Sequence, residues 1–201
     1  RTKRYLAALN TASELATYIP TSTIVLELLS YLEPNPSDEN PILQAISAQP
    51  QEQRRAEMQT LSTMLDVLQA QGKDSWVEAQ NKLLFIKAFV AFSFERYGDA
   101  DNLLREYLAK TMHSDRVADR EHAFFFRASI ARQGANIPPV IAAVRATDYL
   151  DRFPAGPHHD RVREWLCQTL SDLGLYEAAI SSSRAAFVGD MVYAARHHSE
   201  N

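Results

Sequence analysis

Residues 149–176 read YLDRFPAGPHHDRVREWLCQTLSDLGLY, and this stretch decides the fold. Residues 154–157 (PAGP) break a run in which apolar residues recur at helical spacing, because proline and glycine end helices and form turns. A second run of the same spacing follows and is closed by Gly174. The pattern therefore predicts a helix that ends before the PAGP turn and another helix over residues 160–173.

The His158-His159-Asp160 triplet inside this stretch raises the question of a metal or catalytic site. Adjacent histidines point in different directions, whereas one metal ion usually takes helical ligands four residues apart or ligands from elsewhere in the chain. Asp160 suits a helix start, where its carboxylate meets the positive end of the helix dipole. We interpret the triplet as a loop and cap and expect no metal site. The alternative requires Asp160 and a distant further ligand.

The composition of the whole chain favours helices. Only 6 of 201 residues are glycine, and Leu, Ala, Glu, Gln and Arg, which lose little rotamer freedom in a helix, recur throughout. Long apolar–polar alternation and Asn-Gly or Asp-Gly hairpin signals are absent. With 46% hydrophobic and 23% charged residues, the chain is expected to be globular and all-α.

Proline, glycine and capping residues divide the chain into expected helices. Asn40 is expected to cap one of them, and Ser75 with Glu78 forms a capping box for another. The expected helices cover residues 2–18, 22–32, 41–48, 50–71, 75–97, 99–112, 115–133, 138–153, 160–173, 176–188 and 190–198.

Three glycines are expected to end one helix each and to lead into the next. Gly98, Gly134 and Gly174 lie 36 and 40 residues apart, and each interval holds two helices. This period is typical of a helix-hairpin repeat, in which each unit buries its apolar face by stacking on its neighbours.

The repeats resemble the tetratricopeptide repeat (TPR) family, in particular the repeats of bacterial envelope TPR proteins, over residues from about 84 to 190. Two departures stand out: Leu103 occupies a place where a small residue is usual, and Gly134 comes too early in its unit. The positions that carry the resemblance are Cys167, Leu170, Gly174, Tyr176, Ala179 and Ala186 in the last unit, Ala142, Ala146, Tyr149 and Pro154 in the middle unit, and Ala91, Phe94, Gly98 and Tyr107 in the first.

The resemblance implies a TPR-like α-solenoid of stacked antiparallel hairpins over residues 73–201. Residues 1–72 match no known pattern and are expected to form an irregular helical segment packed on the solenoid. Residues 190–198 are expected to be a capping helix or the first helix of a truncated repeat.

In the TPR family the first helix of each hairpin lines a concave groove that receives a peptide or a partner's helix. Carried over by position, this implies an apolar floor and a charged end that orients the partner. The implied groove residues are Phe85, Ala88, Phe92 and Glu95 in the first unit, and Arg161, Glu164, Gln168 and Ser171 in the last.

The leading functional hypothesis is a non-catalytic protein-interaction scaffold in a bacterial envelope-associated or regulatory assembly, periplasmic or cytoplasmic. It includes self-association through the apolar ends of the solenoid. The alternative is a ligand-sensing regulatory module in which residues 1–72 fold across the groove and close a pocket. An enzyme that uses the histidines is the weakest hypothesis. No phosphate-binding loop, zinc-protease or calcium-loop motif is present, and neither catalytic residues nor a cofactor are expected.

Charge and hydropathy exclude several other classes. A net charge of −4 argues against a nucleic-acid partner, and the single cysteine, Cys167, permits no intrachain disulfide.

The apolar run Leu83–Phe94 contains Lys87 and is too short to span a bilayer, so we expect a core helix and no membrane insertion. Because the chain begins at Arg1, we expect that something upstream was removed; its first four residues suit the basic flank of a membrane segment or a solvated helix start.

Several residues have a structural interpretation that we prefer to a functional one. Cys167 is expected to be a buried small apolar residue, and Trp76 and Trp165 are expected to be core anchors. The Phe124–Phe126 triplet spans most of a helical turn and predicts a helix that is buried on two faces.

Overall fold

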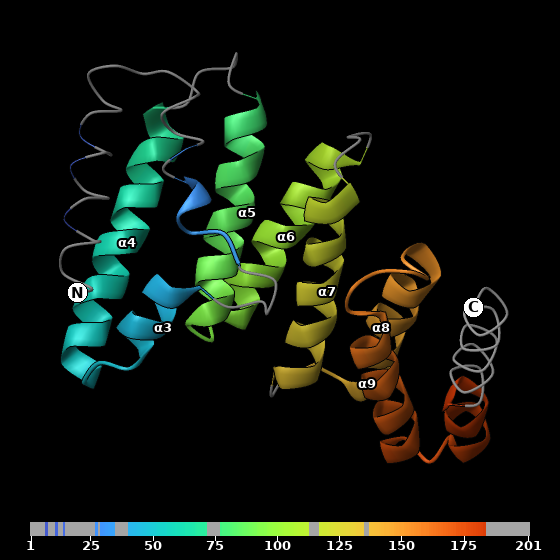
Figure 1. Cartoon of the computed structure of the whole chain (residues 1–201). Helices are drawn as coiled ribbons and strands as arrows, with labels where there is room; N and C mark the ends of the chain where they lie inside the picture. Colours follow the sequence, from blue (N-terminus) through green and yellow to red (C-terminus); the bar gives the residue numbers. More distant parts are fainter. Residues whose placement is uncertain are drawn as a thin grey trace, which may run out of the picture. The chain divides into compact units, whose positions relative to one another are not determined.

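A computed structural model of the chain describes residues 7, 11, 14, 27, 29–34, 40–71, 77–112, 117–134 and 137–183 (Figure 1). All regular elements in these residues are helices, and within each of two compact units consecutive helices pack on one another, which confirms the predicted all-α fold. The expected helix at 190–198, most of the helices at 2–18 and 22–32, Ser75 with Trp76, and Ala186 lie outside the described residues.

Contacts divide the chain into two compact units, residues 1–114 and residues 115–201. The division places the hairpin after residue 77 with the N-terminal helices and not with the later hairpins. The predicted organisation, with its boundary at residue 72, stays a prediction.

Unit 1 contains α3 (Pro41–Ser47), α4 (Gln51–Gln71), α5 (Val77–Ser93) and α6 (Tyr97–Thr111). Asn40 caps α3 as predicted, because its Oδ1 accepts hydrogen bonds from the backbone N–H groups of Ile42 and Leu43 at 2.9 and 3.2 Å. Its Nδ2 group donates to the carbonyl oxygens of Tyr31 and Glu33. One buried side chain therefore both starts the helix and holds the preceding turn.

The core of unit 1 is built around α5, which contacts both α4 and α6. A helix that is apolar on all sides is stable only when neighbours cover it. Accordingly α5 carries nine buried residues: Ala79, Leu83, Leu84, Phe85, Ile86, Ala88, Phe89, Val90 and Ala91. From α4, the row Leu61, Leu65 and Leu68 is almost fully buried.

The turn between α5 and α6 differs from the prediction. The sequence places the helix end at Gly98, but α5 ends at Ser93 and Gly98 lies in the first turn of α6. The chain turns at Glu95, which has a φ of 61°. The N–H of Arg96 bonds the carbonyl of Ala91, and that of Glu95 bonds the carbonyl of Phe92, both at 2.9 Å. This is a Schellman helix end with a glutamate in the position that glycine usually takes.

Unit 2 contains α7 (Val117–Gln133), α8 (Pro139–Arg152) and α9 (His159–Asp172), followed by helical residues 176–183. The predicted loop between α8 and α9 is present, and α8 packs on both α7 and α9. Its buried side is the row Ala142, Ala146 and Tyr149, in which two small residues let the neighbouring helices approach closely. Gly174, with a φ of 75°, ends α9 as predicted.

The side chains of α7 confirm that this helix is buried on two faces. Phe125 and Phe126 are almost fully buried, and Phe124 is half-buried against the ring of Phe153 and the guanidinium group of Arg152. Trp165 of α9 stacks on Phe125 with ring centres 5.4 Å apart. Cys167 is half-buried, less than expected.

Among the residues that the structure describes, no helix has both the length and the apolar character needed to cross a membrane.

Candidate functional site

The predicted groove residues of unit 1 do not share one exposed surface. Phe85 and Ala88 have exposed fractions of 2% and 0%, and the Phe85 ring packs on Tyr107 with centres 5.4 Å apart. Phe92 is half-buried beside Tyr97, and only Glu95 is exposed. Of the expected apolar floor, Phe85 and Ala88 are therefore core residues, because α5 contacts both α4 and α6. The groove as a whole stays a prediction.

The predicted residues of unit 2 lie on a more open face of α9. Arg161, Glu164 and Gln168 are exposed and follow one another at helical spacing. Ser171 is half-buried and donates its hydroxyl hydrogen bond to the carbonyl of Cys167 at 2.9 Å, within the helix. The two halves of the predicted set belong to different compact units.

A hollow of about 250 Å³ lies in unit 2 between α7, α8 and α9, and Gln168 is part of its wall. Gln168 Nε2 donates a hydrogen bond to Asp172 Oδ1 at 3.0 Å, so these two polar side chains form one edge. The lining combines small or apolar residues with polar ones: Ala131, Ile137 and Ala142, with Arg132, Gln168 and Asp172.

A larger hollow of about 430 Å³ lies in unit 1 between α4, α5 and α6. Two cations in its lining are held by carboxylates: Lys87 Nζ lies 2.7 Å from Asp66 Oδ1, and an Arg96 guanidinium nitrogen lies 2.6 Å from Asp99 Oδ2. The hollow is therefore lined by charges of both signs.

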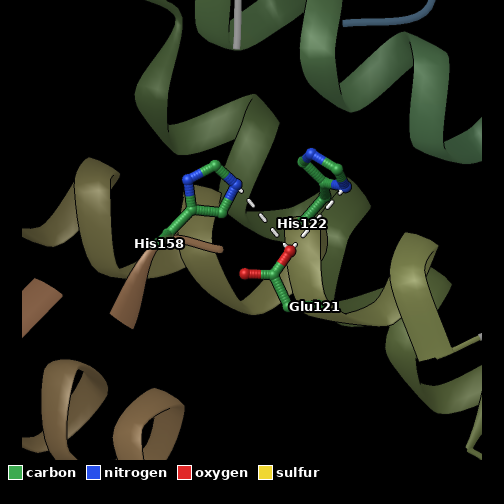
Figure 2. A group of neighbouring side chains, drawn as sticks. All are labelled: Glu121, His122 and His158. Carbon is green, nitrogen blue, oxygen red and sulfur yellow. Dashed lines mark ion pairs between the residues drawn. The ribbon is translucent and has the colours of Figure 1, made fainter. Parts of the chain in front are cut away.

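Three side chains that could hold a metal ion lie close together in unit 2, where the loop before α9 meets α7. Glu121 and His122 come from α7, and His158 comes from the loop (Figure 2). One potential ligand atom from each residue lies within 4.8 Å of the other two. Glu121 Oε2 is 3.8 Å from His122 Nδ1 and 3.8 Å from His158 Nε2, so one carboxylate oxygen faces both imidazole rings. We call these three residues the Glu-His-His cluster.

Tyr149 of α8 orients the carboxylate of the cluster. Its hydroxyl group donates a short hydrogen bond to Glu121 Oε1, the oxygen that does not face the imidazole rings. The same hydroxyl oxygen accepts a hydrogen bond from the backbone N–H of His158 at 3.3 Å. Tyr149 thus connects the carboxylate of α7 to the loop that carries His158.

Stacking and burial fix the ring of His158. The imidazole lies parallel to Phe125 with ring centres 3.9 Å apart and an interplanar angle of 19°, and it meets His122 edge-on at 5.3 Å. The exposed fraction of the residue is 7%. Burial, together with the neighbouring His122 and Arg161, lowers the pKa of His158 to about 4. The ring is therefore neutral at neutral pH, the form in which imidazole binds metals.

The structure answers the question of the His-His-Asp triplet in two parts. His158 occupies the N-cap position of α9 and Asp160 lies in its first turn, as the loop interpretation predicts. The His158 side chain makes no capping hydrogen bond, however, and points instead into the Glu-His-His cluster. His159 Nδ1 lies 3.4 Å from Asp160 Oδ1, apart from the cluster. The two adjacent histidines therefore have different surroundings.

Sequence reasoning missed Glu121 and His122. The metal alternative combined Asp160 with a distant ligand, whereas the cluster combines His158 with Glu121 and His122 and does not include Asp160. This Glu-His pair is an ordinary dipeptide in a helix and carries no recognised motif. The weak signal was the presence of three side chains of metal-binding type near the starts of α7 and α9, two helices that contact each other.

Two imidazole nitrogens and one carboxylate oxygen are the donor set that nitrogen- and oxygen-binding transition metals accept. Glu121 is buried, with 5% of its side chain exposed, whereas 25% of the His122 side chain reaches solvent and offers a path of entry. Among the described residues, the cluster is the one group of three His, Cys, Asp or Glu side chains that could hold a metal ion.

Comparison with known proteins finds no protein-family model, no curated protein and no solved structure that matches the chain. The likeness to TPR proteins therefore remains a prediction, and function has to be argued from the two hollows and the cluster.

Proposed function

We propose that the chain is a non-catalytic helical module that binds another protein, and that the hollow of unit 2 receives one apolar side chain of the partner. The observation that carries the proposal is the position of Gln168, which is exposed on α9 and also lines this hollow. It joins the exposed polar face of α9 to a partly apolar depression.

The size of the hollow supports a side chain as its occupant. Small-molecule pockets usually have volumes of roughly 300–1,000 Å³ and enclose most of the ligand. At about 250 Å³, the hollow of unit 2 is below that range. Apolar contacts with Ala131, Ile137 and Ala142 suit an aliphatic group, while Arg132 and Asp172 can orient the polar backbone or charged neighbours of that group.

Apolar residues on α8 extend the proposed contact beyond the hollow. Val140, Ile141 and Val144 have exposed fractions of 54%, 37% and 60%, next to Pro139 of the lining. Exposed apolar residues that gather in one place are typical of interaction surfaces, whereas scattered ones are ordinary. An extended or helical segment of a partner could contact both surfaces.

A selection of random peptides displayed on phage tests this proposal. The wild type is expected to select peptides that share one aliphatic residue flanked by charges. A Gln168→Trp variant is expected to lose these peptides, because the indole would fill the mouth of the hollow. Glu164→Trp is the matched control, one turn earlier on the exposed face of α9 and outside the lining. Equal binding to all three proteins, or no selection at all, would contradict the proposal.

A second candidate function is ligand sensing by unit 1. Its hollow of about 430 Å³ falls within the range of small-molecule sites, and α4, which belongs to residues 1–72, forms part of the wall. The paired charges suit a small polar metabolite. A thermal-shift screen of such metabolites is expected to give hits that disappear in Asn102→Trp, since Asn102 is exposed and lines this hollow.

Self-association through exposed apolar residues of unit 2 also stays a proposal. Leu175, Tyr176 and Ile180 near the end of the described residues have exposed fractions of 51%, 65% and 52%. A light-scattering mass equal to that of the monomer at high concentration would argue against it.

A further inference from the structure

The geometry points to a transition-metal site, best suited to Zn²⁺, formed by Glu121 and His122 of α7 and His158 of the loop before α9. The inference is independent of the proposed partner binding, since it rests on a different part of unit 2. The donor atoms are Glu121 Oε2, His122 Nδ1 and His158 Nε2.

The distances are near those of a tetrahedral site. With Zn–N bonds of about 2.0–2.1 Å, donor atoms in a tetrahedral zinc site lie roughly 3.3 Å apart. Both imidazole nitrogens lie 3.8 Å from the carboxylate oxygen, and all three atoms lie within 4.8 Å of one another. Modest side-chain rotation, chiefly of the partly exposed His122, brings them to that spacing. Water would occupy the fourth position.

The surroundings hold the donors as metal sites require. Ligand residues are usually fixed by further hydrogen bonds that select the oxygen or nitrogen facing the ion. Here the Tyr149 hydroxyl group donates to Glu121 Oε1 while Oε2 faces the two imidazole rings, and the stack on Phe125 fixes the plane of the His158 ring.

The donor set selects the class of metal. Imidazole nitrogen suits Zn²⁺, Cu²⁺ and Ni²⁺, whereas Ca²⁺ and Mg²⁺ take oxygen ligands. One nearby charge opposes any cation: Arg161 of α9 lies over the rings of Phe125 and Trp165, with its guanidinium carbon 5.3 and 5.2 Å from the ring centres. Removing this charge should therefore strengthen metal binding. An Arg161 variant is thus expected to change the affinity for Zn²⁺ in the direction opposite to the loss of a ligand.

Isothermal titration of untagged, chelator-stripped protein with ZnCl₂ tests the inference, with Co²⁺ absorption as a second readout. We expect one ion per chain and cobalt bands of low-coordinate geometry. His122→Gln and His158→Gln should each weaken Zn²⁺ binding by about 100-fold or more, since removal even of an indirect partner of a ligand costs about 10–100-fold. Arg161→Gln should tighten binding several-fold.

His159→Gln is the matched control, because it removes the adjacent histidine, which lies outside the cluster, and should leave the affinity unchanged. If circular dichroism shows that His158→Gln does not fold, His122→Gln tests Zn²⁺ binding in its place, because it alters a partly exposed side chain. The inference is overturned by a wild type that binds no Zn²⁺ or by equal affinities of the His158 and His159 variants. The chain has a second pair of adjacent histidines, His197 and His198; binding that disappears only in a His197→Ala/His198→Ala double variant would also overturn it.

Discussion

The hydroxyl oxygen of Tyr149 lies 2.7 Å from the point where a β-carbon on Gly156 would stand. Real β-carbons essentially never approach a neighbour so closely, so residue 156 has to be glycine for the Tyr149 hydroxyl to reach both Glu121 and the backbone of His158. The glycine of the PAGP turn therefore serves the packing of the cluster, and not only the turn itself.

Gly156→Ala is expected to destabilise unit 2 by about 1–3 kcal/mol, the usual cost of overpacking a well-filled site. The new methyl group would also stand 3.1 Å from the β-carbon of Phe153, so moving Tyr149 alone does not relieve the contact. Urea denaturation followed by circular dichroism measures the effect. A variant as stable as the wild type would show that the turn can shift without cost.

Tyr149→Phe is expected to lower the free energy of unfolding by about 1–3 kcal/mol, because it leaves Glu121 Oε1 buried without its donor. The ring and its packing against Phe125 and Phe153 are retained, so the loss reports on the hydroxyl group. Tyr107→Phe on α6 is a suitable control, since it removes a hydroxyl group from another buried tyrosine. Equal losses in both variants would argue against a special role for Tyr149.

Two helix ends of the same type predict opposite responses to substitution. Glu95 has a φ of 61° and Gly174 a φ of 75°, and both occupy the left-handed position of a Schellman turn. Glu95→Gly should stabilise unit 1 by about 0.5–1 kcal/mol, because glycine adopts this conformation without steric cost. Gly174→Ala should destabilise unit 2 by about 1–2 kcal/mol.

Gly98→Ala provides the reference for this comparison. Gly98 lies in α6, and an added β-carbon would meet nothing within 4 Å, so alanine should stabilise the helix by about 0.5–1 kcal/mol. Thermal or urea unfolding of the three variants tests the set. If Gly98→Ala proved destabilising and Glu95→Gly did not stabilise, the assigned end of α5 would be wrong.

The buried ring of His158 predicts a pH dependence of stability in the metal-free protein. Its pKa is lowered to about 4 in the folded chain, against 6.5 for an exposed histidine. Below pH 6.5 the unfolded chain therefore takes up a proton that the folded chain does not. The free energy of unfolding is expected to fall as pH decreases from about 6.5 to about 4, by about 3 kcal/mol in total.

The charged or titratable groups that face His158 are Glu121 and His122 of α7 and Arg161 of α9, so variants are needed to identify the contribution of the His158 ring. Unfolding with urea in the presence of a chelator, at several pH values, is compared between the wild type, His158→Gln and His159→Gln. Only His158→Gln should lose this part of the dependence. A His158 ring that titrates near pH 6.5 by NMR would contradict the prediction.

Local sequence signals determined the helices and most of their ends. Asn40 and Pro41 start α3 because an amide oxygen can bind free N–H groups and proline needs no donor there. Gly174 ends α9 because only glycine takes a positive φ freely. The helix break at residues 154–157 (PAGP) is also a local effect, because proline cannot continue a helix. These effects act within a few residues, so they can be read from the sequence.

Tertiary structure alone decided which side chains meet. The Glu-His pair of α7 and His158 are far apart in the chain, and no periodicity relates them; packing of α8 against both α7 and α9 brings them together. The same holds for Phe85 and Ala88, whose spacing fits a groove but whose helix is apolar on all sides and covered by its neighbours. The end of α5 also differs from the predicted end at Gly98. Glu95 takes the left-handed position there, and the N–H groups of Arg96 and Glu95 donate to the carbonyl groups of Ala91 and Phe92.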